Sequence, residues 1–116
     1  GNDTIVGGNG GRDILIGGYG ADYIKGFSAA GTTSLNDEDL LISGASTYET
    51  QLDKLFTLWS IWKQNIPLAT RQAQIQSSDA PLAWGSSLID DGVVDHVYGT
   101  ATKDWYWWNT LQDKKY

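Results

Sequence analysis

The chain has 116 residues, with fourteen acidic side chains against eight basic ones and a net charge of −6. This length suits a single domain with a modest core. The negative charge argues against partners such as nucleic acid or an anionic membrane surface, and no apolar run reaches the roughly 18 residues that a membrane span needs. The chain has no cysteine, so no disulfide stabilises this small domain and a bound metal ion is a reasonable substitute.

Residues 1–26 consist of short units that each contain a glycine-rich turn, an aspartate and an apolar triplet. The units read GNDTIV, GGNGGRDILI and GGYGADYIK. Asp13 and Asp22 are nine residues apart, whereas Asp3 and Asp13 are ten apart because the second turn carries one extra residue. A fixed period of this kind indicates a repeat architecture.

The composition of each unit favours calcium binding. Glycine-rich turns adopt backbone conformations that let their carbonyl oxygens point at a cation, and calcium takes six to eight oxygen ligands. The predicted metal ligands are three carboxylates and the carbonyls of five turn glycines: Asp3, Asp13, Asp22, Gly1, Gly8, Gly10, Gly18 and Gly20.

The triplet after each aspartate is long enough for a very short strand. Side chains alternate between the two faces of a strand, so the middle residues Ile5, Leu15 and Ile24 are expected to point into a narrow core. Two consecutive units would then form one turn of a parallel β-roll, with the aspartates of alternate units stacked on the same side.

Residues 17–25, GGYGADYIK, match the nonapeptide G-G-x-G-x-D-x-U-x at every specified position, where U is a large apolar residue. Residues 7–16 match it with one insertion, and residues 1–6 form the back half of a unit. The chain therefore resembles the RTX (repeat-in-toxin) calcium-binding proteins. The resemblance implies several bound calcium ions, export by type I secretion and folding on contact with extracellular calcium. Because the chain begins within a unit and lacks methionine, we expect it to be part of a longer or processed protein.

The nine-residue rhythm lapses over residues 27–35 and resumes at residues 36–44, NDEDLLISG. Asp39 then occupies the aspartate position and Leu41 the inward one, although no glycine pair precedes them. Asp39 is a further candidate calcium ligand. Asp37 and Glu38 are either additional side-chain ligands or part of a solvated acidic turn.

Residues 45–80 are expected to form an inserted helical hairpin. Ser46 and Glu49 have the spacing of a capping box, and apolar residues at steps of three and four indicate a helix to about Gln64. Pro67 suits the first turn of a second helix that runs to about Gln76. The hairpin would cover an open end or flank of the roll, and its aromatic stripe is either core or a contact face for a partner.

Residues 86–109 read as degenerate repeats, and residues 110–116 as a tail. Asp95 and Asp104 are again nine residues apart, each followed two residues later by an inward apolar residue, Val97 or Tyr106. This pattern fits calcium binding at Asp95 and Asp104. It fits equally well strands that cap the roll without binding metal. Repeats, a helical insert and a final aromatic strand are together similar to the C-terminal regions of large secreted RTX-type bacterial proteins.

The expected fold is a single domain, mainly β with an α insert. It would be a right-handed parallel β-roll of short nonapeptide strands, interrupted by the helical hairpin and continued or capped by the C-terminal strands.

No nucleophile, base and oxyanion hole are arranged for catalysis, and His96, the only histidine, has no metal-binding motif around it. We therefore expect a non-catalytic calcium-binding structural module of a secreted or cell-surface bacterial protein. One alternative is a calcium-dependent fibre subunit that stacks on identical chains through open roll ends. Another is a carbohydrate-binding module that uses the Trp105–Trp108 aromatic run, for which packing under the helices is the simpler fate.

Overall fold

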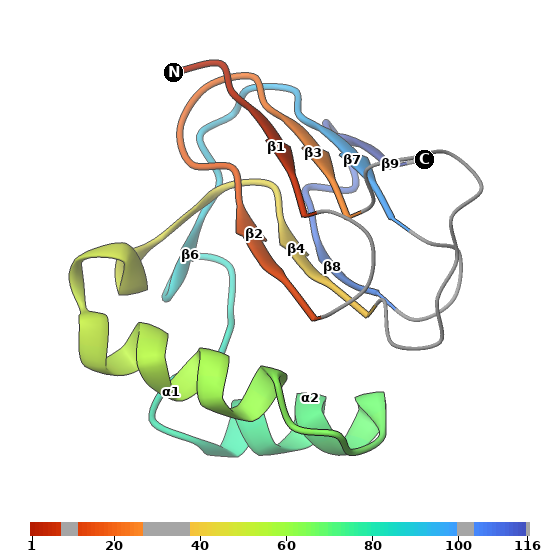
Figure 1. Ribbon diagram of the computed structural model, residues 1–116. Coiled ribbons are helices and arrows are strands. Elements are labelled where there is room, and N and C mark those ends of the chain that lie inside the picture. The colour runs from red at the N-terminus through yellow and green to blue at the C-terminus, as the bar shows by residue number, and fades with distance from the viewer. Residues whose placement is uncertain (8–11, 27–37, 100–103, 116) are drawn as a thin grey trace.

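The computed structural model describes residues 1–7, 12–26, 38–99 and 104–115, which form two parallel sheets and a pair of helices (Figure 1). The predicted ligands Gly8 and Gly10, and Asp37, lie outside these residues. In chain order the elements are β1 (Thr4–Val6), β2 (Ile14–Ile16), β3 (Tyr23–Lys25), β4 (Leu40–Ile42), β5 (Ala45–Ser46), the 3₁₀ helix η1 (Thr47–Thr50), α1 (Leu52–Trp62), α2 (Leu68–Ser77), β6 (Leu88–Ile89), β7 (His96–Tyr98), β8 (Trp105–Trp107) and β9 (Lys114–Lys115).

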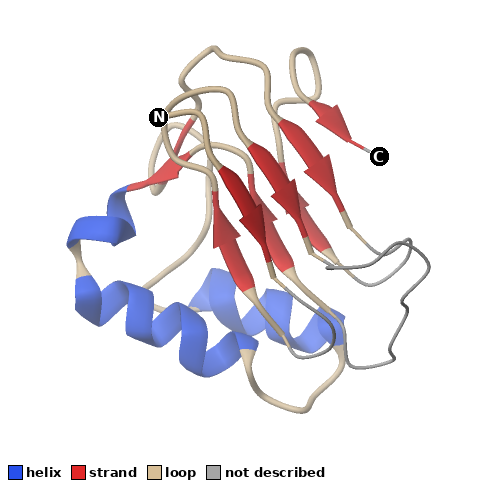
Figure 2. Ribbon diagram, turned by 45° about the horizontal axis from the view of Figure 1, so that its top comes forward, coloured by secondary structure: helices blue, strands red, loops and turns tan. Residues whose placement is uncertain are grey.

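Successive repeat strands alternate between the two parallel sheets (Figure 2). One sheet has the order β1-β3-β7-β9 and the other β2-β4-β8, while β5 and β6 form a separate antiparallel pair. The register aligns equivalent positions of different units, so that Ile24 pairs with Ile5 on one side and with Val97 on the other. The late strands therefore extend the sheets that the first units begin.

A narrow core lies between the two sheets. The middle residues Leu15, Ile24, Leu41 and Val97 are buried there, and Ile5, Tyr106 and Trp108 pack against them. The predicted inward positions are thus confirmed for both the early and the late strands. Each three-residue strand contributes one such residue, because only its central side chain points to this side.

A second and larger core lies between β2-β4-β8 and the helices. Leu40 and Ile42 from β4 are fully buried with Leu58, Trp62 and Ile75 from the helices. Trp105 and Trp107 of β8 pack against this cluster, so the prediction that they lie beneath the hairpin is confirmed.

The predicted fold class, a mainly β roll with a helical insert, is wrong. The structure is a mixed α/β fold in which parallel sheets pack against two helices. Helices α1 and α2 have 11 and 10 residues, whereas no strand in the described part of the chain exceeds three. The helices form a full layer because the outward residues of β2, β4 and β8 are apolar and pack against them. The repeat pattern alone does not predict this packing.

The capping box at Ser46 and Glu49 is confirmed, but it begins η1 and not a long α-helix. Ser46 accepts a hydrogen bond from the Tyr48 amide, and Glu49 accepts one from the Ser46 amide. Helix α1 begins one turn later, and α2 starts directly after Pro67, as predicted. No helix among the described residues is long and apolar enough to cross a membrane.

Candidate metal centre

Aspartates of alternate units are stacked along the four-stranded sheet. Asp3, Asp22, Asp95 and Asp113 each stand immediately before a strand of this sheet. The Asp3 amide donates to Asp22 Oδ1 at 2.8 Å, the Asp22 amide to Asp95 Oδ1 at 2.7 Å, and the Asp95 amide to Asp113 Oδ1 at 3.0 Å. We call this row the first aspartate ladder. Its regularity follows from the parallel register, which brings equivalent residues of neighbouring strands side by side.

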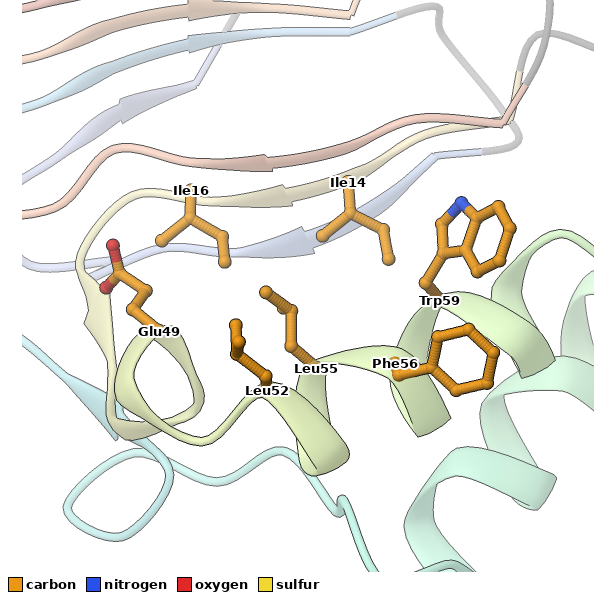
Figure 3. A pocket seen from close by; sticks show the side chains of 7 residues that line it. All are labelled: Ile14, Ile16, Glu49, Leu52, Leu55, Phe56 and Trp59. Atoms are coloured by element: carbon orange, nitrogen blue, oxygen red, sulfur yellow. The ribbon is translucent and has the colours of Figure 1, made fainter.

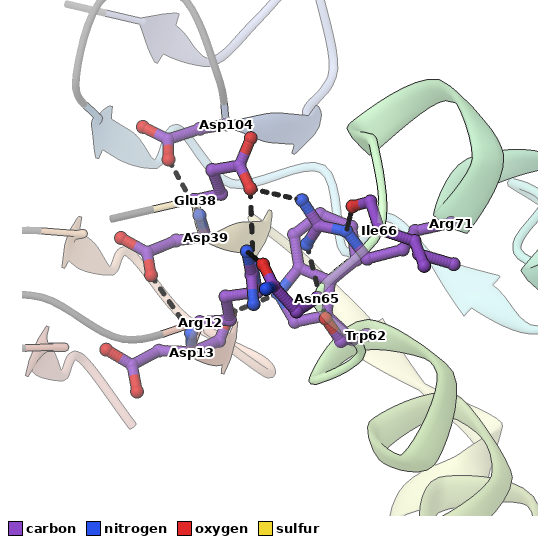
Figure 4. A network of polar contacts seen from close by, with 9 residues as sticks. All are labelled: Arg12, Asp13, Glu38, Asp39, Trp62, Asn65, Ile66, Arg71 and Asp104. Carbon is purple, nitrogen blue, oxygen red and sulfur yellow. Dashed lines mark hydrogen bonds and ion pairs between the residues drawn. The ribbon is translucent and has the colours of Figure 1, made fainter. Parts of the chain in front are cut away.

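A second aspartate ladder runs along the three-stranded sheet and consists of Asp13, Asp39 and Asp104 (Figure 4). The Asp13 amide donates to Asp39 Oδ1 at 3.0 Å, and the Asp39 amide donates to Asp104 Oδ1 at 2.7 Å. The structure thus brings all six predicted aspartates into two rows, three in each. It adds Asp113 to the first row, a residue that sequence reasoning placed in the tail. The signal that could have identified it is its spacing, because Asp113 follows Asp104 by nine residues, as Asp104 follows Asp95.

The second carboxylate oxygens of the first ladder differ from rung to rung. Asp22 and Asp95 are fully buried, and their Oδ2 atoms have no hydrogen-bond partner within the described residues. Asp113 Oδ2, in contrast, accepts from the Asn109 amide at 2.9 Å and from Ser43 Oγ at 2.7 Å. A buried carboxylate oxygen without a hydrogen-bond donor destabilises the folded state. Asp22 and Asp95 therefore need a positively charged or hydrogen-bonding partner, whereas Asp113 already has donors.

Glycines allow these carboxylates to approach the backbone closely. A Cβ added at Gly17 would lie 2.8 Å from Asp22 Oδ2 and 2.6 Å from the Ser43 carbonyl oxygen. Oxygens from a carboxylate and a main-chain carbonyl therefore face the same glycine. A side chain at Gly26 would overlap Asp39 Oδ2 in the same way. This close approach explains why glycine occupies positions 17 and 26.

Three of the predicted glycine ligands meet in the turn before β3. Gly20 has φ of +112°, and a Cβ there would overlap the carbonyl oxygen of Gly1. Gly18 also has a positive φ, +84°. The Gly1 amino group donates to the Tyr19 carbonyl at 3.1 Å, which closes the turn against the start of the chain. The turn geometry is therefore the one that the glycine pattern predicts.

Burial raises the pKa of two rungs. The pKa of Asp95 is raised from its usual 3.8 to about 7 because burial penalises its charged form and Asp113 and Asp22 lie nearby, although the hydrogen bond from the Asp22 amide opposes this. The pKa of Asp22 is also raised, mainly by burial. Without a cation, ionised carboxylates at these positions destabilise the folded state.

These shifts predict the pH dependence of stability in a chelator. The folded state holds the Asp95 proton up to about pH 7, whereas the unfolded chain releases it near pH 3.8. The stability that this proton contributes is fully present below about pH 4 and is lost as the pH rises through about 7. Thermal melts in EDTA should therefore show a higher midpoint at pH 5.5 than at pH 8. A midpoint that is higher at pH 8 would contradict this assignment.

The donor set fits calcium better than a metal that prefers side-chain clusters. Among the described residues, no group of three or more His, Cys, Asp or Glu side chains is placed to hold a metal ion. The oxygens available are single carboxylates and turn carbonyls, the mixed set that calcium accepts. Asp22 and Asp95 are the strongest candidates because each has a buried oxygen in need of a positive partner.

A buried arginine connects the second ladder to the helices (Figure 4). Arg71 of α2 is fully buried and forms an ion pair with Glu38, the residue before Asp39. It also donates to the carbonyls of Trp62 at 3.2 Å and Ile66 at 3.1 Å, and its guanidinium lies 4.4 Å from the centroid of the Trp62 ring. The sequence does not mark this residue as functional, because a single arginine in a polar helix carries no signal of burial.

Three more contacts join the same parts of the chain. Arg12, beside Asp13, pairs with Glu38 at 3.3 Å and donates to Asn65 Oδ1 at 3.1 Å. Trp62 Nε1 donates to the Asp13 carbonyl at 3.1 Å. Glu38 therefore forms ion pairs with two arginines. These contacts indicate a structural role for Glu38, in place of the predicted solvated turn or calcium ligand.

The remaining candidates take part in aromatic packing. Trp105 and Trp107 are half-buried against the helical cluster, which limits their use as a sugar platform. His96 stacks on Tyr23 with ring centroids 4.8 Å apart, on the outer face of the four-stranded sheet.

No family model matches this chain, and no curated protein or solved structure matches it either.

Proposed function

We propose that this chain is a non-catalytic calcium-binding module of a secreted or cell-surface bacterial protein, and that calcium promotes its folding. The observation that carries the proposal is the pair of buried Oδ2 atoms of Asp22 and Asp95, which lack hydrogen-bond donors in the described residues. A calcium ion next to these oxygens would supply the missing positive charge.

A comparison with Asp113 supports a cation, and not a hydrogen-bond donor, beside the second carboxylate oxygens of Asp22 and Asp95. All three aspartates stand in the same row and accept a main-chain amide through Oδ1. Of these three, Asp113 alone has donors for its second oxygen among the residues that the structure describes, namely Asn109 and Ser43. Asp22 and Asp95 thus keep their Oδ2 atoms without a donor among the described residues, whereas Asp113 ends the row with neutral donors.

The energetics of such short strands support a ligand-dependent fold. Ordering a glycine-rich turn costs about 1–2 kcal/mol per residue in backbone entropy, and a strand of three residues buries little apolar surface in return. Extracellular calcium modules bind with dissociation constants of about 10⁻⁴–10⁻³ M. At a few millimolar calcium, each site then adds about 1–2 kcal/mol to the stability of the folded state.

The setting of this function rests on the RTX-like repeats in residues 1–26. Calcium is scarce inside cells and abundant outside them, so a module of this kind would leave the cell unfolded and fold after export. This agrees with the type I secretion that the resemblance implies. Bound calcium would also offset part of the net charge of −6.

Circular dichroism with chelation and calcium return tests the proposal. Protein in EDTA should lose β-structure and melt at a lower temperature, and excess calcium should restore both. Magnesium at the same concentration should not, because it requires smaller and more regular octahedral sites. Spectra and melting midpoints that are equal in EDTA and in calcium would exclude calcium-dependent folding.

A further inference from the structure

A pocket of about 470 Å³ lies just past the end of β8, between the turn that follows this strand and the segments on either side of β6. Its volume falls within the range of about 300–1,000 Å³ that small-molecule sites occupy. The described residues that line it are Trp84, Asp90, Trp108, Asn109, Thr110 and Leu111. Two tryptophans and three polar side chains therefore meet in one place. The groove between β2 and α1 differs, because its lining is apolar apart from Glu49 (Figure 3).

The two cores of the protein hold both tryptophans in place. Trp84 packs against the cluster between the sheet and the helices, and its ring meets the Trp107 ring edge-on with centroids 6.4 Å apart. Trp108 packs against the narrow core between the two sheets. Both side chains are only partly buried and line the pocket with the remainder. The pocket therefore offers aromatic surface that a ligand can contact without first ordering it.

The polar groups beside the rings are also fixed by contacts within the protein. Asn109 Nδ2 donates to Asp90 Oδ2 at 2.6 Å, and Asn109 Oδ1 accepts from the Leu111 amide at 3.0 Å. The Asn109 amide donates to Asp113, the last rung of the first aspartate ladder. Asp90 Oδ1 accepts from the Gly92 amide at 3.3 Å. A carboxylate accepts up to about four hydrogen bonds, and Asp90 is exposed, so it can accept further ones from a ligand.

This combination fits a neutral saccharide. A sugar ring has an apolar C–H face, which packs on the negative face of an indole ring, and hydroxyl groups, which donate to a carboxylate. A purely apolar ligand would desolvate Asp90 without giving it a donor. A sugar acid is disfavoured, because its carboxylate would lie near Asp90 in a protein whose net charge is −6.

We propose that this pocket binds one unit of a neutral oligosaccharide. The sugar ring packs against Trp84 and Trp108, and its hydroxyl groups donate to Asp90. This binding goes beyond the proposed calcium function, and it uses no calcium ion as a ligand. The site also differs from the Trp105–Trp107 strand, whose tryptophans pack against the helical cluster.

Saturation-transfer NMR with defined oligosaccharides tests the proposal. The probes are cellohexaose, mannohexaose and chitohexaose, together with an oligomannuronate of the same length. At least one neutral probe should bind saturably at millimolar concentration, and oligomannuronate should bind at least tenfold more weakly than the tightest neutral probe. Absence of saturable binding by every neutral probe would overturn the proposal, and so would oligomannuronate that binds as tightly as the neutral probes.

Choline tests a different ligand class in the same pocket. Two aromatic rings and a carboxylate can also hold a quaternary ammonium group, so choline is titrated under the same conditions. Saturable choline binding that Asp90→Asn abolishes, without oligosaccharide binding, would overturn the assignment to a saccharide.

Protein variants locate the site. Trp84→Ala and Trp108→Ala should each weaken binding of the tightest probe at least tenfold. Asp90→Ala should do the same, because hydrogen bonds to a charged group are strong, and it should change the melting temperature little because Asp90 is exposed. This variant keeps the test decisive where the loss of a partly buried tryptophan unfolds the chain.

Trp59→Ala is the matched control, since Trp59 is 44% exposed and lines the separate groove between β2 and α1. It should keep the parent affinity within about twofold. Unchanged affinity in Asp90→Ala, or an equal loss in Trp59→Ala, would overturn the assignment of the site. The titrations use protein that circular dichroism shows to be folded, so they stand whether or not folding depends on calcium.

Discussion

Replacing Arg71 with methionine is expected to lower the free energy of unfolding by about 3–5 kcal/mol, the usual cost of breaking a buried ion pair from one side. Arg71 is fully buried, and its loss leaves the buried Glu38 with Arg12 as its remaining cation. The carbonyl of Trp62, the last residue of α1, also loses a donor. Chemical denaturation followed by tryptophan fluorescence measures the effect.

Lys54→Met is the matched control because it removes a positive charge from a residue of α1 that is only partly buried. Its effect should stay below about 1 kcal/mol, as for other surface charges. A loss of under 1 kcal/mol for Arg71→Met would contradict the role of Arg71 as the connection between the helices and the second aspartate ladder.

Replacing Asp95 with asparagine is expected to change stability in opposite directions with and without calcium. In EDTA at pH 8 the variant should be more stable than the parent, because the buried Asp95 carboxylate is ionised above its pKa of about 7. Asparagine removes this charge and keeps an oxygen that can accept from the Asp22 amide. In calcium the variant should be less stable, because a neutral amide is a weaker ligand. The calcium-dependent gain should fall by about 1–2 kcal/mol, the contribution of one site.

Melts of both proteins in EDTA and in calcium provide the measurement. Asp79→Asn is the control, since Asp79 is exposed and lies outside both ladders. It should leave the calcium-dependent gain unchanged. If Asp95→Asn keeps the full gain, Asp95 is not a calcium ligand. If the variant is also less stable than the parent in EDTA at pH 8, the ionised Asp95 carboxylate is stabilised without calcium, which contradicts the expected cost of its buried charge.

The sequence was sufficient to predict the six three-residue strands and the rows of aspartates that precede them. A nine-residue period places each aspartate before a triplet, and parallel pairing then stacks Asp3 on Asp22 and Asp13 on Asp39. The same period located the inward residues Leu41 and Val97, even though their turns lack most of the glycines. Periodic spacing is a local property, so it can be read without knowing the rest of the fold.

The periodic spacing could not predict that the helices form a full layer, or which distant segments contact each other. Whether two helices are an insert or a layer depends on how much of a sheet they cover, which is a matter of tertiary packing. The burial of Arg71 depends on Glu38, which is 33 residues earlier in the chain. Asp113 differs from these two, because it keeps the nine-residue spacing from Asp104 but the turn before it has none of the repeat glycines. The extent of the helical layer and the burial of Arg71 depend on contacts between remote parts of the chain, and no local pattern marks them.

Calorimetric titration of calcium into chelated protein at pH 8 tests calcium binding most directly. We predict saturable binding with a dissociation constant of about 10⁻⁴–10⁻³ M, accompanied by a rise in melting temperature that magnesium does not reproduce. Heats that equal those of dilution, together with an unchanged melting temperature, would contradict the proposal that buried aspartates such as Asp22 and Asp95 bind calcium.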